Sequence, residues 1–390
     1  MAREIGRREG TPLYLVGGPV RDLLLGRSIR DVDLTIEGDA TRFAKCLARS
    51  AGGNVRIHGR FKTATVVLPE GCRVDLVTAR SETYDRPGAL PRIHPGTIAE
   101  DLARRDVTIN AMAVRLAPAH DPIVLDPHGG RDDLKERTVR FLHAASPVDD
   151  PTRAFRAVRY ANRFGFRLAR SAGAAIRRSV AQGWFASVSG DRIRRELEKI
   201  LDEPGRAGAI ALLGRVGLHA VLQPGLAPSR RILTGLRRAE ALAPQPVRWF
   251  AFLLVWASML AESEAAALSR RLNLRRDDAA ALQNWPRTLA RLRSEGSRGA
   301  AGGARVSPLS PEERLAVSAS LGAGGRAALA RSEADPLALR IRGRDLLRAG
   351  ASPGPAIGSA LARTLTARRD GRIAEKDELD YALAALRSGA

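Results

Sequence analysis

Cysteine is almost absent from this 390-residue sequence, which contains only Cys46 and Cys72. Two isolated thiols form neither a disulfide framework nor a zinc site, and the six histidines show no metal-ligand spacing. Long apolar runs are missing too, since the longest, around Phe250 to Leu260, is too short for a membrane span. No signal peptide is recognisable at the start. These absences predict a cytoplasmic protein with no membrane partner.

Aromatic residues and lysines are also few. Aromatics make up 4% of the chain against 44% hydrophobic residues, so the cores must consist mainly of Leu, Ala and Val, which favours helices. Only five of the 64 basic residues are lysines, a bias typical of GC-rich genomes. That bias explains arginine in place of lysine but not the formal charge of +22. A field of this sign attracts polyanions, so we expect a nucleic-acid partner.

The length predicts more than one domain, and the pattern changes after residue 145. Before it, short β-type runs alternate with helical stretches, which predicts an α/β or α+β domain. Beyond it, Ala, Leu and Arg recur at helical spacing, and Asp150 with Pro151 suits a helix start with aspartate as the cap. The expected strands are Leu13–Val16, Asp31–Ile36, Thr63–Leu68, Arg73–Thr78, Ala111–Leu116 and Ile123–Leu125, and the expected helices Val20–Leu25, Thr41–Ala51 and Ile98–Leu102.

Two aspartates, Asp31 and Asp33, flank one valine in a strand-like segment. Side chains at i and i+2 of a strand point to the same face, so the two carboxylates can share divalent metal. Mg²⁺ prefers one or two protein carboxylates together with substrate phosphates. Asp75, in a second apolar strand, either completes a three-carboxylate catalytic cluster or is an edge-strand charge, and the sequence leaves both interpretations open.

The residues just before the aspartates favour phosphate binding. Gly17 and Gly18 allow close backbone approach, and Arg21 supplies a charge-assisted donor. The chain has no Gly-x-x-x-x-Gly-Lys-Ser/Thr, and it lacks the spaced glycines of a dinucleotide fold. This segment therefore predicts a site for a nucleoside triphosphate and Mg²⁺.

Residues 17–33 resemble the metal-binding motif of the class II tRNA nucleotidyltransferase and bacterial poly(A) polymerase family, part of the polymerase β-like superfamily. Residues 104–111 resemble its ribose-reading motif, with Val107 where the family more often has phenylalanine. Blocks at 126–134, 149–156 and 189–197 then follow in the family's order. The last of these resembles the block that steadies the neck helix.

The resemblance implies an α+β fold, with a nucleotidyltransferase head built on a mixed sheet and followed by helical domains. These are the head at 1–140, a neck that recognises the base at 141–205, a body at 206–295, and a linker with an RNA-binding tail at 296–390. Asp31 and Asp33 would hold the metal. The substrate-binding residues that we expect are Gly17, Gly18, Arg21, Arg104, Arg105, Asp106, Asn110, Asp150, Arg153, Arg156 and Arg159.

Asp150 and Arg153 have a physical rationale as base readers. Cytosine and adenine each present an amino donor beside an unprotonated ring nitrogen, whereas uracil and guanine present a carbonyl beside an N–H. A carboxylate accepts from the amino group and a guanidinium donates to the ring nitrogen. The pair would therefore select C and A, although Asp150 could instead only cap the helix. Arg156, Arg159 and Arg163 form a basic stripe that contacts triphosphate or RNA, or is a solvated face.

These observations predict an enzyme that adds C and A to the 3′ end of tRNA without a template, from CTP and ATP, with release of pyrophosphate. A partial CC- or A-adding enzyme and a poly(A) polymerase remain alternatives. A basic RNA-binding protein with an inactive site is disfavoured by the intact Asp31 and Asp33 pair. The sequence does not indicate the oligomeric state.

Overall fold

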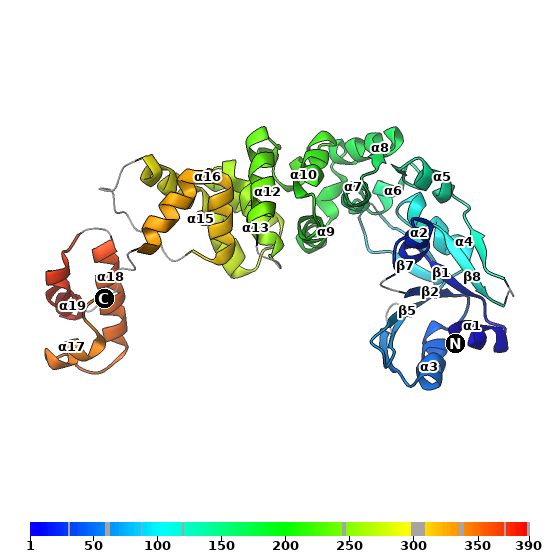
Figure 1. Ribbon diagram of the computed structural model, residues 1–390, viewed down its shortest axis with the longest axis horizontal. Coiled ribbons are helices and arrows are strands. Elements are labelled where there is room, and N and C mark those ends of the chain that lie inside the picture. The colour runs from blue at the N-terminus through cyan, green and yellow to red at the C-terminus, as the bar shows by residue number, and fades with distance from the viewer. Residues whose placement is uncertain are drawn as a thin grey trace. The chain divides into compact units, whose positions relative to one another are not determined.

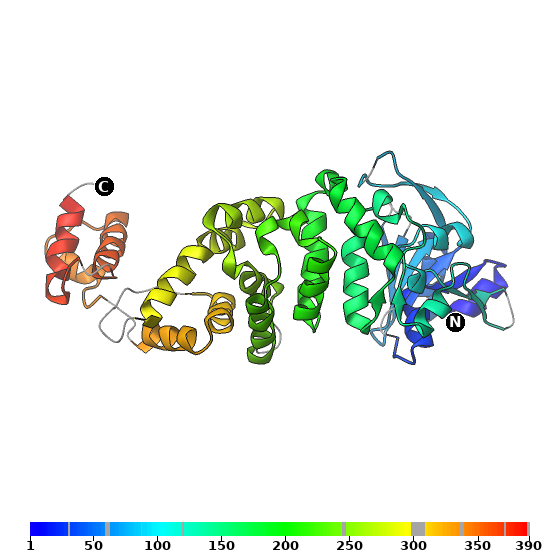
Figure 2. The same cartoon turned by 90° about the horizontal axis from the view of Figure 1, so that it is seen from above.

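The computed structural model describes residues 1–29, 32–58, 63–86, 88–118, 121–243, 247–297, 309–334, 339–369 and 372–387. These residues belong to two compact units, Met1–Pro228 with Arg270–Asn273, and Ser229–Ser269 with Leu274–Ala390. Figures 1 and 2 show the strands gathered in the first unit and only helices in the second. The four-domain division expected from the sequence stays a prediction.

A seven-stranded sheet forms the framework of the first unit, with the strand order β3-β4-β5-β2-β1-β8-β9. The β2 and β5 strands pair in parallel and the other neighbours are antiparallel, so the sheet is mixed and the expected α+β class is confirmed. Its strands are β1 (Leu13–Val16), β2 (Val32–Ile36), β3 (Asn54–His58), β4 (Thr63–Val67), β5 (Arg73–Thr78), β8 (Ala113–Ala117) and β9 (Ile123–Leu125).

The register of β2 against β5 places Asp33 directly beside Asp75. Since registered neighbours in a sheet point to the same face, the two carboxylates share one side. The adjoining core residues Leu13, Ile36 and Leu76 are fully buried, and burial of each such side chain is worth about 1.5–3 kcal/mol. The strand that carries Asp33 is therefore held rigidly from both sides.

Helices on the sheet have well-formed ends. α3 (Ala40–Ala51) starts where the Asp39 carboxylate accepts from the Thr41 and Arg42 amides, ends at Gly52 with φ +65°, and packs on β3, β4 and β5. The remaining helical segments of the head are α1 (Ala2–Arg8), α2 (Gly18–Leu24), α4 (Ile98–Ala103), η2 (Thr108–Asn110) and α5 (Gly130–Lys135).

The helices after the sheet continue the first unit. Phe155, Val158 and Ala161 on α7 are buried, which confirms the core face expected for this helix. The segments are α6 (Ser146–Asp149), α7 (Arg153–Phe164), α8 (Arg170–Ala181), η3 (Trp184–Ser187), α9 (Gly190–Asp202), α10 (Arg206–Arg215), α11 (His219–Leu222) and η4 (Pro224–Leu226).

The expected helix start at Asp150–Pro151 is wrong by a few residues. The Asp150 carboxylate accepts from the Thr152 amide at 3.0 Å and the Thr152 hydroxyl at 2.7 Å, which closes a turn before the helix. Thr152 is the N-cap, and α7 begins at Arg153. Asp150 therefore shapes the approach to the helix, because aspartate bonds locally to backbone N–H groups outside helices.

Several strands were not expected from the sequence. β3 is an edge strand whose five residues are all exposed, so it lacks the apolar alternation that marks a half-buried strand. β6 (Arg80–Thr83) and β7 (Arg92–Pro95) form a short polar hairpin. β10 (Thr138–Val139) forms a two-residue ladder with β11 (Arg167–Leu168), a strand that lies beyond residue 145.

The second unit is helical. The apolar run near residue 250 forms α13, whose eight residues are all buried, so this run is a core helix. No helix among the described residues is long and apolar enough to cross a membrane. The segments are α12 (Arg230–Leu242), α13 (Trp249–Trp256), η5 (Ala257–Met259), α14 (Glu262–Arg271), α15 (Arg276–Ser297), α16 (Pro311–Ala334), α17 (Gly343–Arg348), α18 (Pro355–Arg369), η6 (Glu375–Asp377) and α19 (Glu378–Arg387).

Candidate active site

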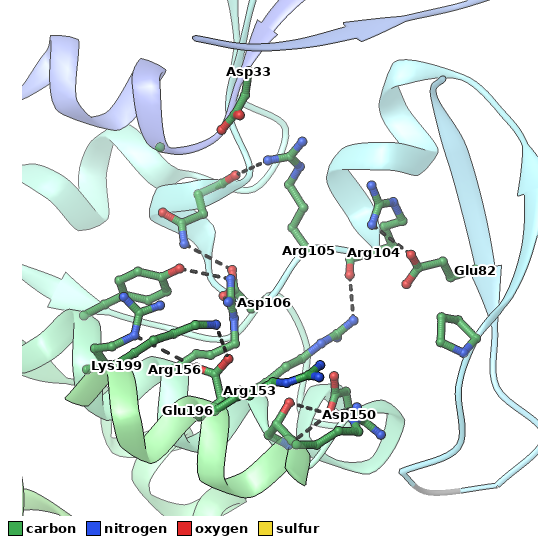
Figure 3. Close-up of a pocket in the computed structure, with 18 of the residues that line it drawn as sticks. Asp33, Glu82, Arg104, Arg105, Asp106, Asp150, Arg153, Arg156, Glu196 and Lys199 are labelled. Atoms are coloured by element: carbon green, nitrogen blue, oxygen red, sulfur yellow. Dashed lines mark hydrogen bonds and ion pairs between the residues drawn. The ribbon is translucent and has the colours of Figure 1, made fainter. Parts of the chain in front are cut away.

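One cavity of about 750 Å³ in the first unit brings together residues from the sheet region and from the helices that follow it. Figure 3 shows Asp33 and Arg105 at one side of this cavity and Arg156, Glu196 and Lys199 at the other. The expected site residues that line it are Gly18, Arg21, Asp33, Arg104, Arg105, Asp106, Asn110, Asp150, Arg153, Arg156 and Arg159.

Gly17 does not itself line the cavity, but it adjoins Gly18, which does, and it lies beside two arginines of the lining. Gly17 is the N-cap of α2 and has φ +71°, a conformation that glycine adopts without strain. A side chain there would collide with the Arg105 guanidinium. Arg21 donates to the Asn110 side-chain oxygen at 2.6 Å, and Arg105 donates to the Asn110 carbonyl at 3.2 Å. Asn110 thus fixes both cations beside the glycine turn.

Asp101, which is fully buried, holds a pair of arginines. Its carboxylate accepts from Arg104 at 2.6 Å and from Arg105 at 2.9 Å. Burial alone would raise the pKa of Asp101, but the adjacent Arg105 and Arg104 charges outweigh it and hold the pKa below its ordinary value. The carboxylate therefore stays charged and orients both guanidinium groups of the expected ribose motif.

Asp106 links this motif to α7. Its carboxylate accepts from Arg156 at 2.7 Å and from the Asn110 amide at 3.2 Å. Burial acts to raise the pKa of Asp106, yet the Arg156 charge and these hydrogen bonds keep it below the ordinary value. Asp106 is therefore a charged anchor between the head and the following helix.

The three expected carboxylates have different positions. Asp33 lines the cavity. Asp75 lies beside Asp33 in the sheet but does not line the cavity. Its carboxylate accepts from the Thr65 hydroxyl at 2.6 Å and pairs with Arg73 at 2.9 Å. Asp31 lies outside the described residues. Among the residues that are described, no three His, Cys, Asp or Glu side chains gather as a metal site.

The expected base-reading pair lies at the opposite end. The donors that reach Asp150, from Thr152 and from Arg192 at 2.8 Å, all meet its Oδ1 atom. Arg153 donates to the Ser146 hydroxyl at 3.0 Å and to the Arg104 carbonyl at 2.7 Å. Asp150 is thus held by one oxygen, which orients the other as a hydrogen-bond acceptor.

The hairpin formed by β6 and β7 also contributes to the cavity. Tyr84 donates to Glu82 at 2.7 Å and accepts from Arg153 at 3.3 Å. Burial and the bond to Glu82 raise the pKa of Tyr84, so its hydroxyl stays protonated. The segment after Arg80 therefore contacts Arg153 of the expected base-reading pair in this structure.

The basic stripe of α7 is not uniformly solvated. Arg159 is buried, pairs with Glu203 at 3.0 Å, and stacks over the Tyr160 ring with its guanidinium carbon 4.7 Å from the centroid. Arg163 pairs with the same Glu203. Both arginines line the cavity, but Arg163 is exposed, so the solvated-face interpretation is wrong for Arg159.

One polar face of α9 also lines the cavity and was not predicted from the sequence. Arg192, Arg195, Glu196 and Lys199 line the cavity, and they recur at i, i+3, i+4 and i+7, the spacing of one helix face. A polar stripe at that spacing, opposite the buried Ile193, Leu197 and Ile200, is the signal that would have found them.

The chain is similar to known proteins along most of its length. A model described as the poly A polymerase head domain matches residues 13–140, and one described as the probable RNA and SrmB-binding site of polymerase A matches residues 165–229. The CC-adding tRNA nucleotidyltransferase of Deinococcus radiodurans is 34% identical over 384 residues, 98% of this chain and 92% of its own length. The chain belongs to the tRNA nucleotidyltransferase and poly(A) polymerase family.

Other members of the family are similar over part or all of the chain. The A-adding tRNA nucleotidyltransferases of Geobacter sulfurreducens and Halalkalibacterium halodurans are 38% and 42% identical over 64% and 61% of this chain. The matching segment is only 28% and 56% of those proteins' lengths. A solved CCA-adding enzyme in an apo form superposes with a TM-score of 0.77 at 31% identity, over 98% of this chain and 94% of that one.

The two family matches leave a gap that contains part of the cavity. Asp33, Arg105 and Asp106 lie within the head match, whereas Asp150 and Arg153 lie between residues 140 and 165. The expected base-reading pair thus lies in the segment between the two matches. Any role for Asp150 and Arg153 must therefore be argued from their own hydrogen bonds.

Proposed function

We propose that this protein adds C and A nucleotides to the 3′ end of tRNA without a nucleic-acid template, using CTP and ATP and releasing pyrophosphate. One observation carries the proposal: a single cavity joins Asp33, the arginines beside the Gly17 turn, and the Asp150–Arg153 pair. A nucleoside triphosphate bound there would place its phosphates at the first end and its base at the second.

The chain's own residues account for nucleotide selection in this proposal. Asp150 is held through Oδ1, so Oδ2 would accept from the amino group of C or A. Arg153 commits three of its five N–H donors to protein acceptors among the described residues, which leaves donors for the ring nitrogen. Uracil and guanine would place a carbonyl against the Asp150 carboxylate, which repels them.

The phosphate end fits a divalent cation. Asp33 supplies hard oxygen ligands beside the glycine turn and Arg21, which suits Mg²⁺ bound jointly by protein carboxylate and phosphate. Asp33 and Asp31 would hold the ion, and when bound it would neutralise charge on the reacting phosphates. Arg21 and Arg105 would orient the triphosphate by charge-assisted hydrogen bonds.

A restricted product is the second candidate. One relative that matches along nearly the whole chain is a CC-adding enzyme, and two partial matches at 38% and 42% identity are A-adding enzymes. A CC-adding or an A-adding enzyme would use the same cavity but would add only part of the CCA end. A poly(A) polymerase would use this cavity with ATP alone on other RNA.

One extension assay separates these activities. Three tRNA transcripts, ending before CCA, after C and after CC, are offered with CTP, ATP or both. Extension of all three to CCA supports the proposal. Addition of only CC, or of only A to the CC form, identifies the restricted enzymes, and long A tails on unrelated RNA would overturn the tRNA assignment.

Matched variants test the metal assignment. Asp33→Ala should abolish incorporation while tRNA binding remains measurable. Asp75→Ala, on the neighbouring strand, should retain activity if Asp75 is an edge-strand charge, and should abolish it if Asp75 is a third catalytic carboxylate. Full activity of Asp33→Ala would refute the assignment. A cytoplasmic location also stays a prediction.

A further inference from the structure

One aromatic side chain of α7 lies among three arginines of the candidate active site. Tyr160 is buried and lines the cavity together with Arg21, Arg156 and Arg159. The guanidinium carbons of these arginines lie over its ring, at 5.7, 5.5 and 4.7 Å from the ring centroid respectively. Cations at this distance are attracted by the negative charge on the faces of an aromatic ring. Tyr160 is therefore a contact that the three cations share.

Each of the three arginines is also held by polar partners of its own. These partners are Asp22 and Asn110 for Arg21, Asp106 for Arg156, and Glu203 for Arg159. They lie in α2, in η2, just before η2 and just after α9, so each partner fixes one arginine against a different element. Like charges gathered in one cavity repel one another. The Tyr160 ring offsets that repulsion at the point where the three guanidinium groups meet.

The hydroxyl of Tyr160 adds a hydrogen bond to its ring contact with Arg156. Its oxygen accepts from Arg156 Nη2 at 3.0 Å, while the Asp106 carboxylate accepts from Arg156 Nε at 2.7 Å. The charge of Asp106 also holds the pKa of Arg156 above its ordinary value, so the guanidinium stays charged. Arg156 is thus fixed at two of its nitrogens, and Tyr160 supplies one of the two contacts.

Phe164, four residues after Tyr160 and on the same face of α7, completes the surroundings of Arg21. The two rings are stacked, with centroids 6.4 Å apart and an angle of 16° between their planes. The Arg21 guanidinium carbon also lies 4.6 Å from the Phe164 centroid, while Asp22 and Asn110 hold the nitrogens of the same group. Arg21 belongs to α2, so the rings join the glycine turn to the helix that carries the other two arginines.

The arginines keep hydrogen-bond donors for a ligand. Among the described residues, Arg21 gives three of its five N–H groups to Asp22 and Asn110. Arg156 gives two of its five to Asp106 and Tyr160. The donors that remain face a cavity that also contains Asp33, and phosphate oxygens are the acceptors that guanidinium groups bind most strongly.

We propose that Tyr160 is a positioning residue for the nucleoside triphosphate: its ring holds Arg21, Arg156 and Arg159 in the arrangement that binds the phosphates. The inference rests on the proposed function and adds to it a side chain that acts through the arginines. Donors that are already oriented need no reorganisation when the charge of the substrate arrives, which makes their electrostatic contribution large. Loss of the ring should therefore weaken binding of the phosphates and spare binding of the nucleoside.

The test replaces the ring in the full-length protein. Calorimetry measures the affinity for ATP and for CTP, and adenosine and cytidine are measured as competitors. Tyr160→Leu removes the ring and the hydroxyl, so it should weaken binding of the nucleotides about tenfold to thirtyfold and change that of the nucleosides by less than about twofold. Unchanged nucleotide affinity, or an equal loss for the nucleosides, would overturn the assignment.

Two further variants keep the test decisive if Tyr160→Leu lowers stability. Phe155→Leu removes another buried ring of α7, which packs on Phe185 with centroids 5.8 Å apart and is not among the residues that line the cavity. It should lower the melting temperature and leave nucleotide affinity unchanged. Tyr160→Phe keeps the ring and loses only the hydroxyl bond to Arg156, so it should recover most of the lost affinity. A Tyr160→Phe protein as weak as Tyr160→Leu would show that the ring does not position the arginines.

A double variant tests whether Tyr160 acts through the arginines. Arg159 lies nearest to the ring, and Arg159→Ala should itself weaken nucleotide binding. Tyr160→Leu should cost a smaller factor in the Arg159→Ala protein than in the unaltered one, because the effects of residues in contact are not additive. Full additivity of the two losses would contradict the proposal.

These measurements separate failure of the inference from failure of the proposed function. If the unaltered protein binds ATP and CTP but extends no RNA, the proposed function fails, and the comparison of Tyr160→Leu with Phe155→Leu still decides the role of the ring. If it extends tRNA while Tyr160→Leu binds both nucleotides normally, the assignment of Tyr160 fails alone. Binding of neither nucleotide by the unaltered protein would overturn both.

Discussion

Arg192 joins the carboxylate of Asp150 to the loop that follows β6. One guanidinium nitrogen donates to Asp150 Oδ1 at 2.8 Å, and the other donates to the Gly88 carbonyl at 2.7 Å. Gly88 has φ +74°, and a side chain there would lie 2.6 Å from the Ser187 hydroxyl oxygen. A residue of α9 therefore positions the proposed base reader and ties it to a segment of the head.

Replacement of Arg192 should impair nucleotide selection. Arg192→Ala removes a charge-assisted bond, worth about 1.5–3 kcal/mol, so kcat/KM should fall roughly tenfold to a hundredfold for the accepted nucleotide. Incorporation of UTP and GTP should rise relative to it, because Asp150 loses its fixed orientation. Single-turnover incorporation with each of the four nucleotides measures both effects.

Two companion variants separate positioning from general disruption. Arg192→Lys keeps the charge but cannot reach Asp150 and Gly88 together, so it should recover part of the rate and little of the selectivity. Arg178→Ala removes an exposed arginine of α8 and should match the unaltered protein. Equal losses for all four nucleotides in Arg192→Ala would contradict a positioning role.

Removal of the Asp101 carboxylate should destabilise the first unit. Asp101→Asn leaves Arg104 and Arg105 without the charge that holds them, and breaking a buried pair costs about 3–5 kcal/mol. In a domain of this size the melting temperature should drop by about 6–20 °C. Calorimetry measures the drop. Glu100→Gln changes the exposed neighbour in the α4 capping box and should lower the melting temperature far less than Asp101→Asn does.

Acid should weaken the protein through Asp106. The folded pKa of Asp106 lies below its unfolded value of about 3.9, so its contribution is fully present above about pH 4 and is lost as the pH falls through the folded pKa. The Asp106→Asn variant lacks this contribution of the carboxylate charge to stability. Its free energy of unfolding should be about 3–5 kcal/mol lower than that of the unaltered protein at pH 7, and the gap should narrow as the pH falls below about 4 and through the folded pKa.

Urea unfolding at several pH values measures that gap. Asp132→Asn is the control, because Asp132 and its partner Lys135 are both largely exposed and such pairs contribute at most about 1 kcal/mol. If the gap between Asp106→Asn and the unaltered protein stays constant from pH 7 to pH 2, the pKa shift does not contribute to stability.

The parts of the site that local sequence encodes were predictable. Gly17, Arg21 and Asp33 occupy one short segment, and their chemistry follows from residue type and spacing. The strand β1 can be predicted from its apolar content, and all four of its residues are buried. The edge strand β3, whose residues are all exposed, carries no such signal because its pairing with β4 depends on backbone hydrogen bonds.

The long-range contacts were not predictable from one sequence. Tyr84 and Arg153 lie 69 positions apart, and Arg192 and Asp150 lie 42 positions apart. Which polar groups meet depends on how α7 packs against α9 and against the β10 and β11 pair, and that packing is set by apolar residues elsewhere. For the same reason, the burial of Arg159 was not predictable. Its helical spacing suggests a solvated side chain, but in the structure it is buried against Tyr160 and Glu203.

A side chain at position 17 should damage both stability and activity. Gly17 has φ +71° and ψ −125°, a conformation that L residues avoid at a cost of about 1–3 kcal/mol, and an added methyl group would displace the Arg105 guanidinium. Gly17→Ala should therefore lower stability by about 2–4 kcal/mol with overpacking included, and should reduce kcat/KM for the nucleotide at least about tenfold, since a small misplacement near the chemistry is costly.

Gly10→Ala is the matched control for that substitution. Gly10 has φ +61°, but nothing lies within 4 Å of the position of an added methyl group. It should cost about 1–2 kcal/mol of stability from backbone strain alone and leave nucleotide incorporation unchanged. Thermal melting and initial rates on the same preparations give both quantities. An equal loss of activity in the two variants would show that strain, and not the position of Arg105, limits the reaction.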